Sequence, residues 1–135
     1  MERRVYVAGS TRDAERVRYV QDIVRDLGYT ITFDWTGPED EIRTDGSWDA
    51  ASDRGAEIAL REIQACRDAD LIILLYPPNG GGLGCWIEVG AGLASGSEVY
   101  VVGAKRDSVF WQHPAVMRFD SVDDLAVQLE LVRVG

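Results

Sequence analysis

Glu88 is the carboxylate whose position in the sequence best suits a catalytic role. Glu88 follows four glycines, at positions 80, 81, 82 and 84. Glycines let a chain fold close against a ligand, so Gly82 and Gly84 are candidate substrate-binding positions. We expect Glu88 in about the first turn of the helix that follows, where the helix dipole keeps a carboxylate ionised. An ionised carboxylate over a ligand crevice can attack an anomeric carbon, although acids also occupy first helical turns for the dipole alone.

A second candidate loop lies near the start of the chain. Gly9, Ser10, Thr11 and Arg12 directly follow an apolar run at residues 5–8 and precede a helix. The glycine lets a ligand approach the backbone, and the amino end of the helix offers unpaired N–H groups. The arginine could add a positive charge, so the loop suits a phosphate or a sugar hydroxyl. An ordinary strand-to-helix turn is the alternative, and the loop is not a P-loop, because GxxxxGK[ST] is missing.

The other reactive side chains give weaker signals. Asp70 precedes an apolar run and is most simply a turn residue. His113 is the only histidine, so it makes neither a metal site nor a catalytic triad. Cys66 and Cys85 have neither metal nor redox spacing, and buried free thiols are expected. The sequence therefore predicts no metal and no cofactor.

Two of the tryptophans lie in an otherwise polar stretch. Trp35 and Trp48 fall within residues 34–52, a long connection with no clear period. Long connections inside compact domains are usually functional or mobile. Packing is the commoner role of a tryptophan, but these two are the best candidates to stack on a planar base.

Strand and helix signals alternate along the whole chain. Strands are expected at residues 5–8, 29–33, 71–75 and 99–102, with a short one at 119. Helices are expected between a cap at residues 10–13 and Gly28, at about 53–67, at about 85–94, and after a cap at Ser121. The uninterrupted apolar run at 71–75 belongs in the centre of a parallel sheet.

This alternation predicts a single α/β domain over residues 1–135, a three-layer sandwich with helices on both faces of a parallel sheet. Right-handed crossovers and five strands favour the flavodoxin-like (Rossmann-like) strand order 2-1-3-4-5. Ligands of such sheets bind beyond the carboxyl ends of the strands, where the strand order reverses. The two glycine-containing loops should therefore meet at one crevice.

Composition limits the classes of partner. The chain has 135 residues and a net charge of −9, which repels nucleic acid. No apolar run approaches the roughly 20 residues that a membrane span needs. The amino-terminal segment lacks the pattern of a signal peptide, so a cytoplasmic location is expected.

Three segments together carry a resemblance. They are residues 5–10, residues 69–72 and residues 84–94, which read VYVAGS, ADLI and GCWIEVGAGLA. In this order and at these separations they resemble the nucleoside 2-deoxyribosyltransferase family and its relatives that hydrolyse nucleoside 5′-monophosphates. The resemblance covers nearly the whole chain.

The resemblance implies roles for several residues. Glu88 matches the catalytic glutamate that forms a covalent glycosyl-enzyme intermediate, and Asp70 matches an aspartate that orients the sugar and supports proton transfer. Tyr6 matches a tyrosine close to that glutamate. Gly9, Ser10 and Arg12 look like the loop that contacts a 5′-phosphate. The resemblance also implies a small nucleoside or nucleotide substrate and a homo-oligomer, a dimer or larger, whose subunits share the active site.

The chain also departs from the family pattern. Where the transferases carry a further aspartate, and the monophosphate hydrolases a serine, this sequence has Gly81 and Gly82. We expect cleavage or transfer at an N-glycosidic bond, with hydrolysis favoured because the first loop suits a phosphate. A nucleotide-binding or sensing domain without catalysis is the alternative, and a flavin-binding flavodoxin-like protein is a third.

Overall fold

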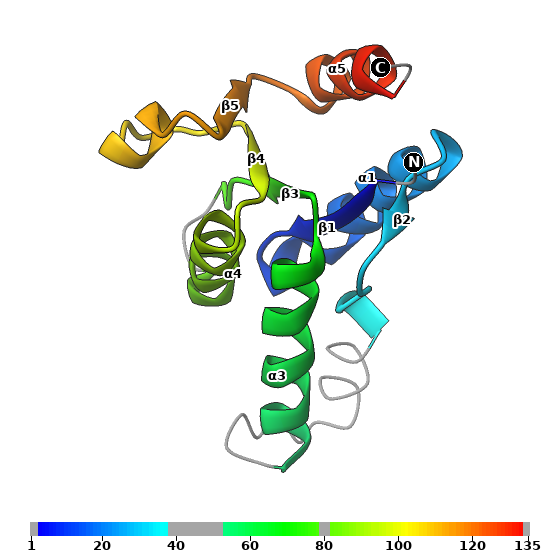
Figure 1. Ribbon diagram of the computed structural model, residues 1–135, viewed down its shortest axis with the longest axis vertical. Helices are drawn as coiled ribbons and strands as arrows, with labels where there is room; N and C mark the ends of the chain where they lie inside the picture. Colours follow the sequence, from blue (N-terminus) through cyan, green and yellow to red (C-terminus); the bar gives the residue numbers. More distant parts are fainter. Residues whose placement is uncertain (1–2, 38–52, 79–81, 134–135) are drawn as a thin grey trace.

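The computed structural model describes residues 3–37, 53–78 and 82–133, in which strands and helices alternate (Figure 1). The strands are β1 (Arg4–Ala8), β2 (Thr30–Ile31), β3 (Leu71–Leu75), β4 (Glu98–Val102) and β5 (Val116–Phe119). The helices are α1 (Ala14–Asp26), α3 (Asp53–Asp68), α4 (Leu83–Ala94) and α5 (Val122–Val132). Two short 3-10 turns, η1 (Thr11–Asp13) and η2 (Val109–Gln112), complete the described elements.

The sheet confirms the predicted topology. Its strand order is β2-β1-β3-β4-β5, and every neighbouring pair is parallel. In a parallel sheet all carboxyl ends meet at one edge, and the strand order reverses between β1 and β3. The loops that follow these two strands therefore flank the same crevice.

Helices cover both faces of this sheet. α1 and α5 pack on one face, while α3 and α4 pack together on the other (Figure 1). The residues of β3 are all buried, as are the last four residues of β1 and of β4. Burial on both faces is why these strands are apolar without interruption.

The second strand is shorter than expected. Only Thr30 and Ile31 pair with β1, whereas the sequence predicted a strand at residues 29–33. The chain still follows β1 for one more hydrogen bond, from the Thr32 N–H to the Val5 carbonyl (2.9 Å). The next free carbonyl of that edge, that of Val7, instead accepts the indole N–H of Trp35 (2.8 Å). A side chain, rather than backbone, satisfies the edge of β1 beyond this point.

Two glycines let helices approach the sheet closely. A Cβ at Gly92 would lie 2.6 Å from Ile72 Cγ1, and a Cβ at Gly9 would lie 2.8 Å from Val17 Cγ2. Real Cβ atoms do not approach other heavy atoms this closely, so each contact requires glycine. Gly92 lets α4 pack closely on β3, and Gly9 lets the start of α1 pack closely on the end of β1.

No helix among the described residues is both long enough and apolar enough to cross a membrane.

Candidate functional site

A polar cavity of about 180 Å³ lies at the carboxyl edge of the sheet, beside the point where the strand order reverses. Its walls come from the loop after β1, from Trp35, from α3 and from the first turns of α4. Its acidic groups among the described residues are the side chains of Glu62 and Glu88. The cavity thus joins the two loops that the sequence predicted to meet.

Glu88 is buried, with 6% of its surface exposed, yet it lines this cavity. The hydroxyl of Tyr6, on β1, donates a hydrogen bond to Glu88 Oε2. Tyr6 is fully buried within the sheet, so its hydroxyl holds the carboxylate from a fixed position. A hydrogen bond donated to a carboxylate favours the ionised form, which is the nucleophilic one.

The expected position of Glu88 in the first helical turn is corrected. α4 begins at Leu83, two residues before the expected start, so Glu88 is the sixth residue of the helix and lies in its second turn. The effect of a helix dipole falls off within the first turn. The hydrogen bond from Tyr6 therefore acts on this carboxylate where the helix dipole no longer does.

The pKa of the Tyr6 hydroxyl is well above its ordinary value. Burial is the largest cause, followed by the negative charges of Glu88 and Glu62. A phenol in this setting keeps its proton over the whole range in which enzymes work, so Tyr6 acts here as a hydrogen-bond donor and not as a base.

Glu62 is a site residue that the sequence reasoning missed. It lies on α3 and lines the cavity, and its charge, like that of Glu88, raises the pKa of Tyr6. A signal was present in the sequence. Glu62 shares the helical face of Ile58, Ala65 and Cys66, which are all buried, so it is the one acid in an apolar stripe that faces the core.

Asp70 does not lie at this site, and its expected role is corrected. It immediately precedes β3, at the amino edge of the sheet, where its carboxylate accepts the backbone N–H of Arg4 (2.9 Å). The five residues of β3 separate it from the carboxyl edge, a span of roughly 16 Å of extended chain. Its contacts are those of a turn residue that joins β1 to β3.

The loop after β1 contributes three of its four expected residues. Gly9, Ser10 and Thr11 line the cavity, whereas Arg12 is exposed and is not part of the described lining. The Ser10 side chain accepts the backbone N–H of Arg12 (3.3 Å) and so caps η1. The close approach of Val17 already requires glycine at position 9, so this glycine is not by itself a sign of a ligand.

Of the two candidate stacking residues, Trp35 borders the cavity. It is 3% exposed, and its indole N–H donates to the Val7 carbonyl. Little of its ring surface is therefore accessible to a base that would stack on it. Trp48 lies outside the described residues.

The glycines before Glu88 shape the entrance of α4. Gly82 and Gly84 both line the cavity, and Gly81 lies outside the described residues. Gly82 has φ of +73°, a left-handed conformation, and a Cβ there would lie 3.0 Å from Pro77 Cγ. Gly82 is therefore needed to turn the chain into α4.

The two cysteines are free and buried, as expected. Burial, and next the charge of Glu88, raises the pKa of the Cys85 thiol to about 12, and Cys66 is shifted in the same direction. The Cys85 thiol lies 2.8 Å from the Gly82 carbonyl, to which it donates. Neither thiol is prepared as a nucleophile, and no group of three metal-ligating side chains occurs in the part of the chain that is described.

Comparison with known proteins informs on the fold. No family model matches the sequence, and no curated protein matches it. The fold is similar to the structure of the Clostridium botulinum CMP N-glycosidase BcmB, with a TM-score of 0.62 and 14% sequence identity. The match covers 94% of this chain and 98% of that one. At this identity the likeness establishes the shared architecture.

Proposed function

We propose that this protein cleaves the N-glycosidic bond of a nucleoside or of its 5′-monophosphate. The observation that carries the proposal is the buried Glu88 carboxylate, held by the Tyr6 hydroxyl at the wall of a small polar cavity. The fold shared with a protein described as a CMP N-glycosidase supports the same class of reaction.

The first step is a displacement by Glu88. An oxygen of its carboxylate attacks C1′ of the sugar, while the bond from C1′ to the base nitrogen breaks and its electron pair leaves with the base. The leaving base takes a proton, and we assign this proton to the carboxylic acid of Glu62. Glu62 takes the role that the family resemblance implied for Asp70, because Glu62 lines the cavity.

The second step releases the sugar. The Glu62 carboxylate accepts a proton from a water molecule, whose oxygen attacks C1′ and frees the Glu88 carboxylate. The sugar leaves with its original anomeric configuration. A second base could take the place of water, and we favour hydrolysis because the loop after β1 suits a phosphate better than a second base.

The lining of the cavity offers backbone groups that suit a 5′-phosphate. The loop after β1 and the amino end of α4 both open to the cavity, through Ser10, Thr11, Leu83 and Gly84. Backbone N–H groups at helix starts favour anions, and they also bind sugar hydroxyls. We propose that these groups hold the 5′ end of the substrate while C1′ faces Glu88.

The homo-oligomer implied by the resemblance remains a prediction. Light scattering on the purified protein gives its mass in solution, and a mass above that of one chain of 14.9 kDa is expected.

An assay for free base tests the proposed reaction. The purified protein is incubated with ribo- and deoxyribonucleosides and their 5′-monophosphates, with and without an added acceptor base, and chromatography follows the products. Free base is expected from the wild type and not from Glu88→Ala. A new nucleoside formed only with acceptor would show a transferase. Equal release of base by the wild type and Glu88→Ala would contradict the proposal.

A further inference from the structure

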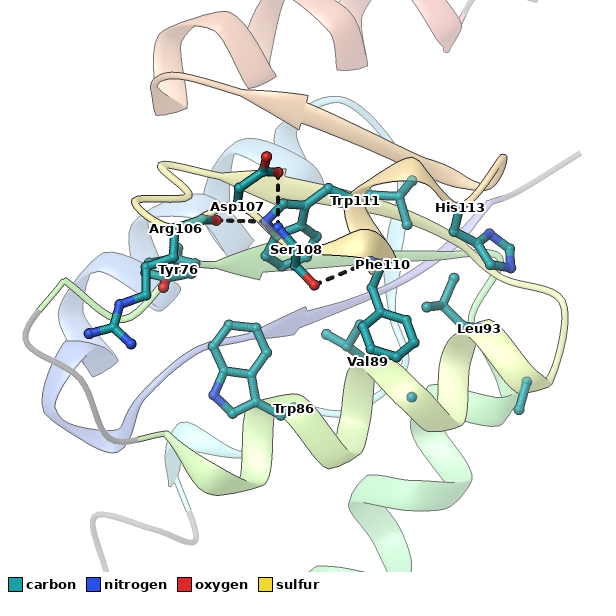
Figure 2. A pocket seen from close by; sticks show the side chains of 13 residues that line it. Tyr76, Trp86, Val89, Leu93, Arg106, Asp107, Ser108, Phe110, Trp111 and His113 are labelled. Carbon is teal, nitrogen blue, oxygen red and sulfur yellow. Dashed lines mark hydrogen bonds between the residues drawn. The ribbon is translucent and has the colours of Figure 1, made fainter.

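A second and larger cavity lies on the opposite side of α4 from Glu88. It has a volume of about 640 Å³ and lies between α4 and the segment that leads from β4 to β5 (Figure 2). Small-molecule sites in proteins commonly enclose about 300–1,000 Å³. Trp86, Val89 and Leu93 face this cavity, whereas Glu88 faces the polar one, so the two sites share a helix but not a wall.

Aromatic rings form much of its lining. Trp86 meets Tyr76 edge-on, with ring centroids 5.6 Å apart at 70°, and meets Trp111 at 6.3 Å and 45°. Phe110 closes one side and remains 67% exposed (Figure 2). Rings that stand at angles and are only partly covered offer both faces and edges to a flat ligand.

Hydrogen bonds hold the far wall in place. The Trp111 indole N–H donates to the Arg106 carbonyl (2.8 Å), and Ser108 Oγ accepts the N–H of Phe110 (3.2 Å). Ser108 N–H in turn donates to Asp107 Oδ1 (2.9 Å). The aromatic wall is therefore positioned by its own loop before any ligand arrives.

Gly90 keeps the helical side of this cavity open. It lies within α4, where glycine costs about 1 kcal/mol relative to alanine. A Cβ at Gly90 would meet nothing within 4 Å, so packing does not require glycine there, in contrast to Gly92. Because Gly90 has no side chain, the part of the cavity that it lines stays open.

One end of the cavity is lined by an arginine and an aspartate, Arg106 and Asp107. The Arg106 side chain extends at the Tyr76 end (Figure 2), and among the described residues no ion pair engages it. The neighbouring carboxylate, that of Asp107, faces Arg118 at 3.9 Å. In a chain of net charge −9, an arginine beside an aromatic cavity selects for an acidic group.

We propose that this cavity is a second ligand site, which binds a flat aromatic acid of about two fused rings. The rings lie among Trp86, Phe110 and Trp111, and the acidic group reaches the Arg106 guanidinium. The site does not depend on N-glycosidic chemistry, because it uses none of the residues that line the polar cavity.

Titration with 2-naphthoate tests this site, with 2-naphthalenemethanol as the uncharged probe of the same shape. Isothermal calorimetry gives the affinity, and quenching of tryptophan fluorescence reports on the rings. We expect saturable binding of one naphthoate per chain, with the alcohol bound at least about tenfold more weakly, which corresponds to about 1.4 kcal/mol.

Two variants and one control locate the binding. Gly90→Leu should weaken naphthoate binding by about tenfold or more, because the side chain enters the cavity, whereas Gly90→Ala should retain it. Arg106→Gln should remove the preference for the acid over the alcohol, and this variant decides the matter if Gly90→Leu fails to fold. Absence of saturable binding, or equal binding by all variants, would overturn the proposal. A dimer that excludes the probe from this face would overturn it too.

Discussion

Two polar side chains, Tyr6 and Glu62, accompany Glu88 at the polar cavity. Tyr6 donates to Glu88, and burial together with the two carboxylates keeps the phenol protonated. Glu62 lies on another helix and faces the same space. Glu88, Tyr6 and Glu62 come from α4, β1 and α3, which the sheet brings together. In the proposed mechanism they are the nucleophile, its hydrogen-bond donor and the acid.

Tyr6→Phe removes the hydrogen bond and keeps the ring in the core. A hydrogen bond to a charged group is worth about 1.5–3 kcal/mol, so kcat should fall by roughly 10- to 100-fold. The ionised form of Glu88 is also less favoured, so the acid limb of the pH–rate profile should move to higher pH. Steady-state rates of base release between pH 4 and 8 measure both effects. An unchanged rate and profile would show that the hydroxyl does not act on Glu88.

Glu62→Gln tests the proposed acid. Loss of a general acid typically costs about 10²- to 10⁴-fold in rate, and the loss should be smaller for nucleosides whose base leaves without protonation. Glu57→Gln is the matched control, because Glu57 lies on the same helix, pairs with Arg54 (3.3 Å) at the surface and should tolerate the change. A uniform loss for all leaving bases would indicate a structural role for Glu62 instead.

At the scale of elements, α4 is the helix that both sites share. Its two internal glycines differ in what surrounds them, since a Cβ at Gly92 would meet Ile72 and a Cβ at Gly90 would meet nothing. Close packing therefore requires glycine at position 92 and not at position 90, because helical spacing turns the two positions to different faces of α4.

The two glycines should therefore respond in opposite ways to alanine. Gly92→Ala should destabilise the fold by about 1–3 kcal/mol, because α4 must move away from β3. Gly90→Ala should stabilise it by up to about 1 kcal/mol, through helix propensity. Chemical denaturation of both variants compares the free energies of unfolding. Equal effects in the two variants would contradict the packing described for α4.

In the segment after β2, Asp34 is a hydrogen-bonded carboxylate whose pKa is shifted. Burial acts to raise the pKa of this carboxyl, but hydrogen bonds from Thr36 and Gln21 and the charge of Arg25 outweigh it, so the pKa lies below its ordinary value. A lowered folded-state pKa gives stability that is present above the unfolded value and is lost as the pH falls through the folded value. Stability should therefore fall below about pH 4 with a contribution from Asp34.

Asp34→Asn measures that contribution. The variant should be less stable than the wild type at pH 7, and the difference should shrink as the pH approaches 3. Urea denaturation at several pH values gives the comparison. A difference that stays constant over this range would mean that the charge of Asp34 contributes nothing.

At the scale of the whole molecule, the fold was predictable and the site only in part. Alternating strand and helix signals and the handedness of crossovers led to the observed strand order. The crevice followed from that order, and so did the meeting of the Gly9–Thr11 loop with Glu88. These features depend on patterns that repeat along the chain.

The placement of single side chains was harder to predict. Asp70 was assigned to the site through the family resemblance, but it lies at the amino edge of the sheet, and the site lies at the carboxyl edge. Glu62 was missed because its place in the apolar stripe of α3 indicates only that it faces inward, and its direction toward the cavity depends on how α3 packs on the sheet. Arg12 follows the glycine loop, yet the short η1 turn leaves it exposed. Each of these depends on three-dimensional direction rather than on spacing.

Mass spectrometry tests most directly whether Glu88 forms a covalent bond to the sugar. A nucleoside with fluorine at the 2′ position slows both steps, because fluorine destabilises the positive charge that develops at C1′, and an activated leaving base lets the first step proceed. After incubation, peptide mapping should find the mass of the fluorinated sugar on the peptide that contains Glu88, and Glu88→Ala should carry none. Base release by the wild type without any adduct, together with full activity of Glu88→Ala, would contradict the account.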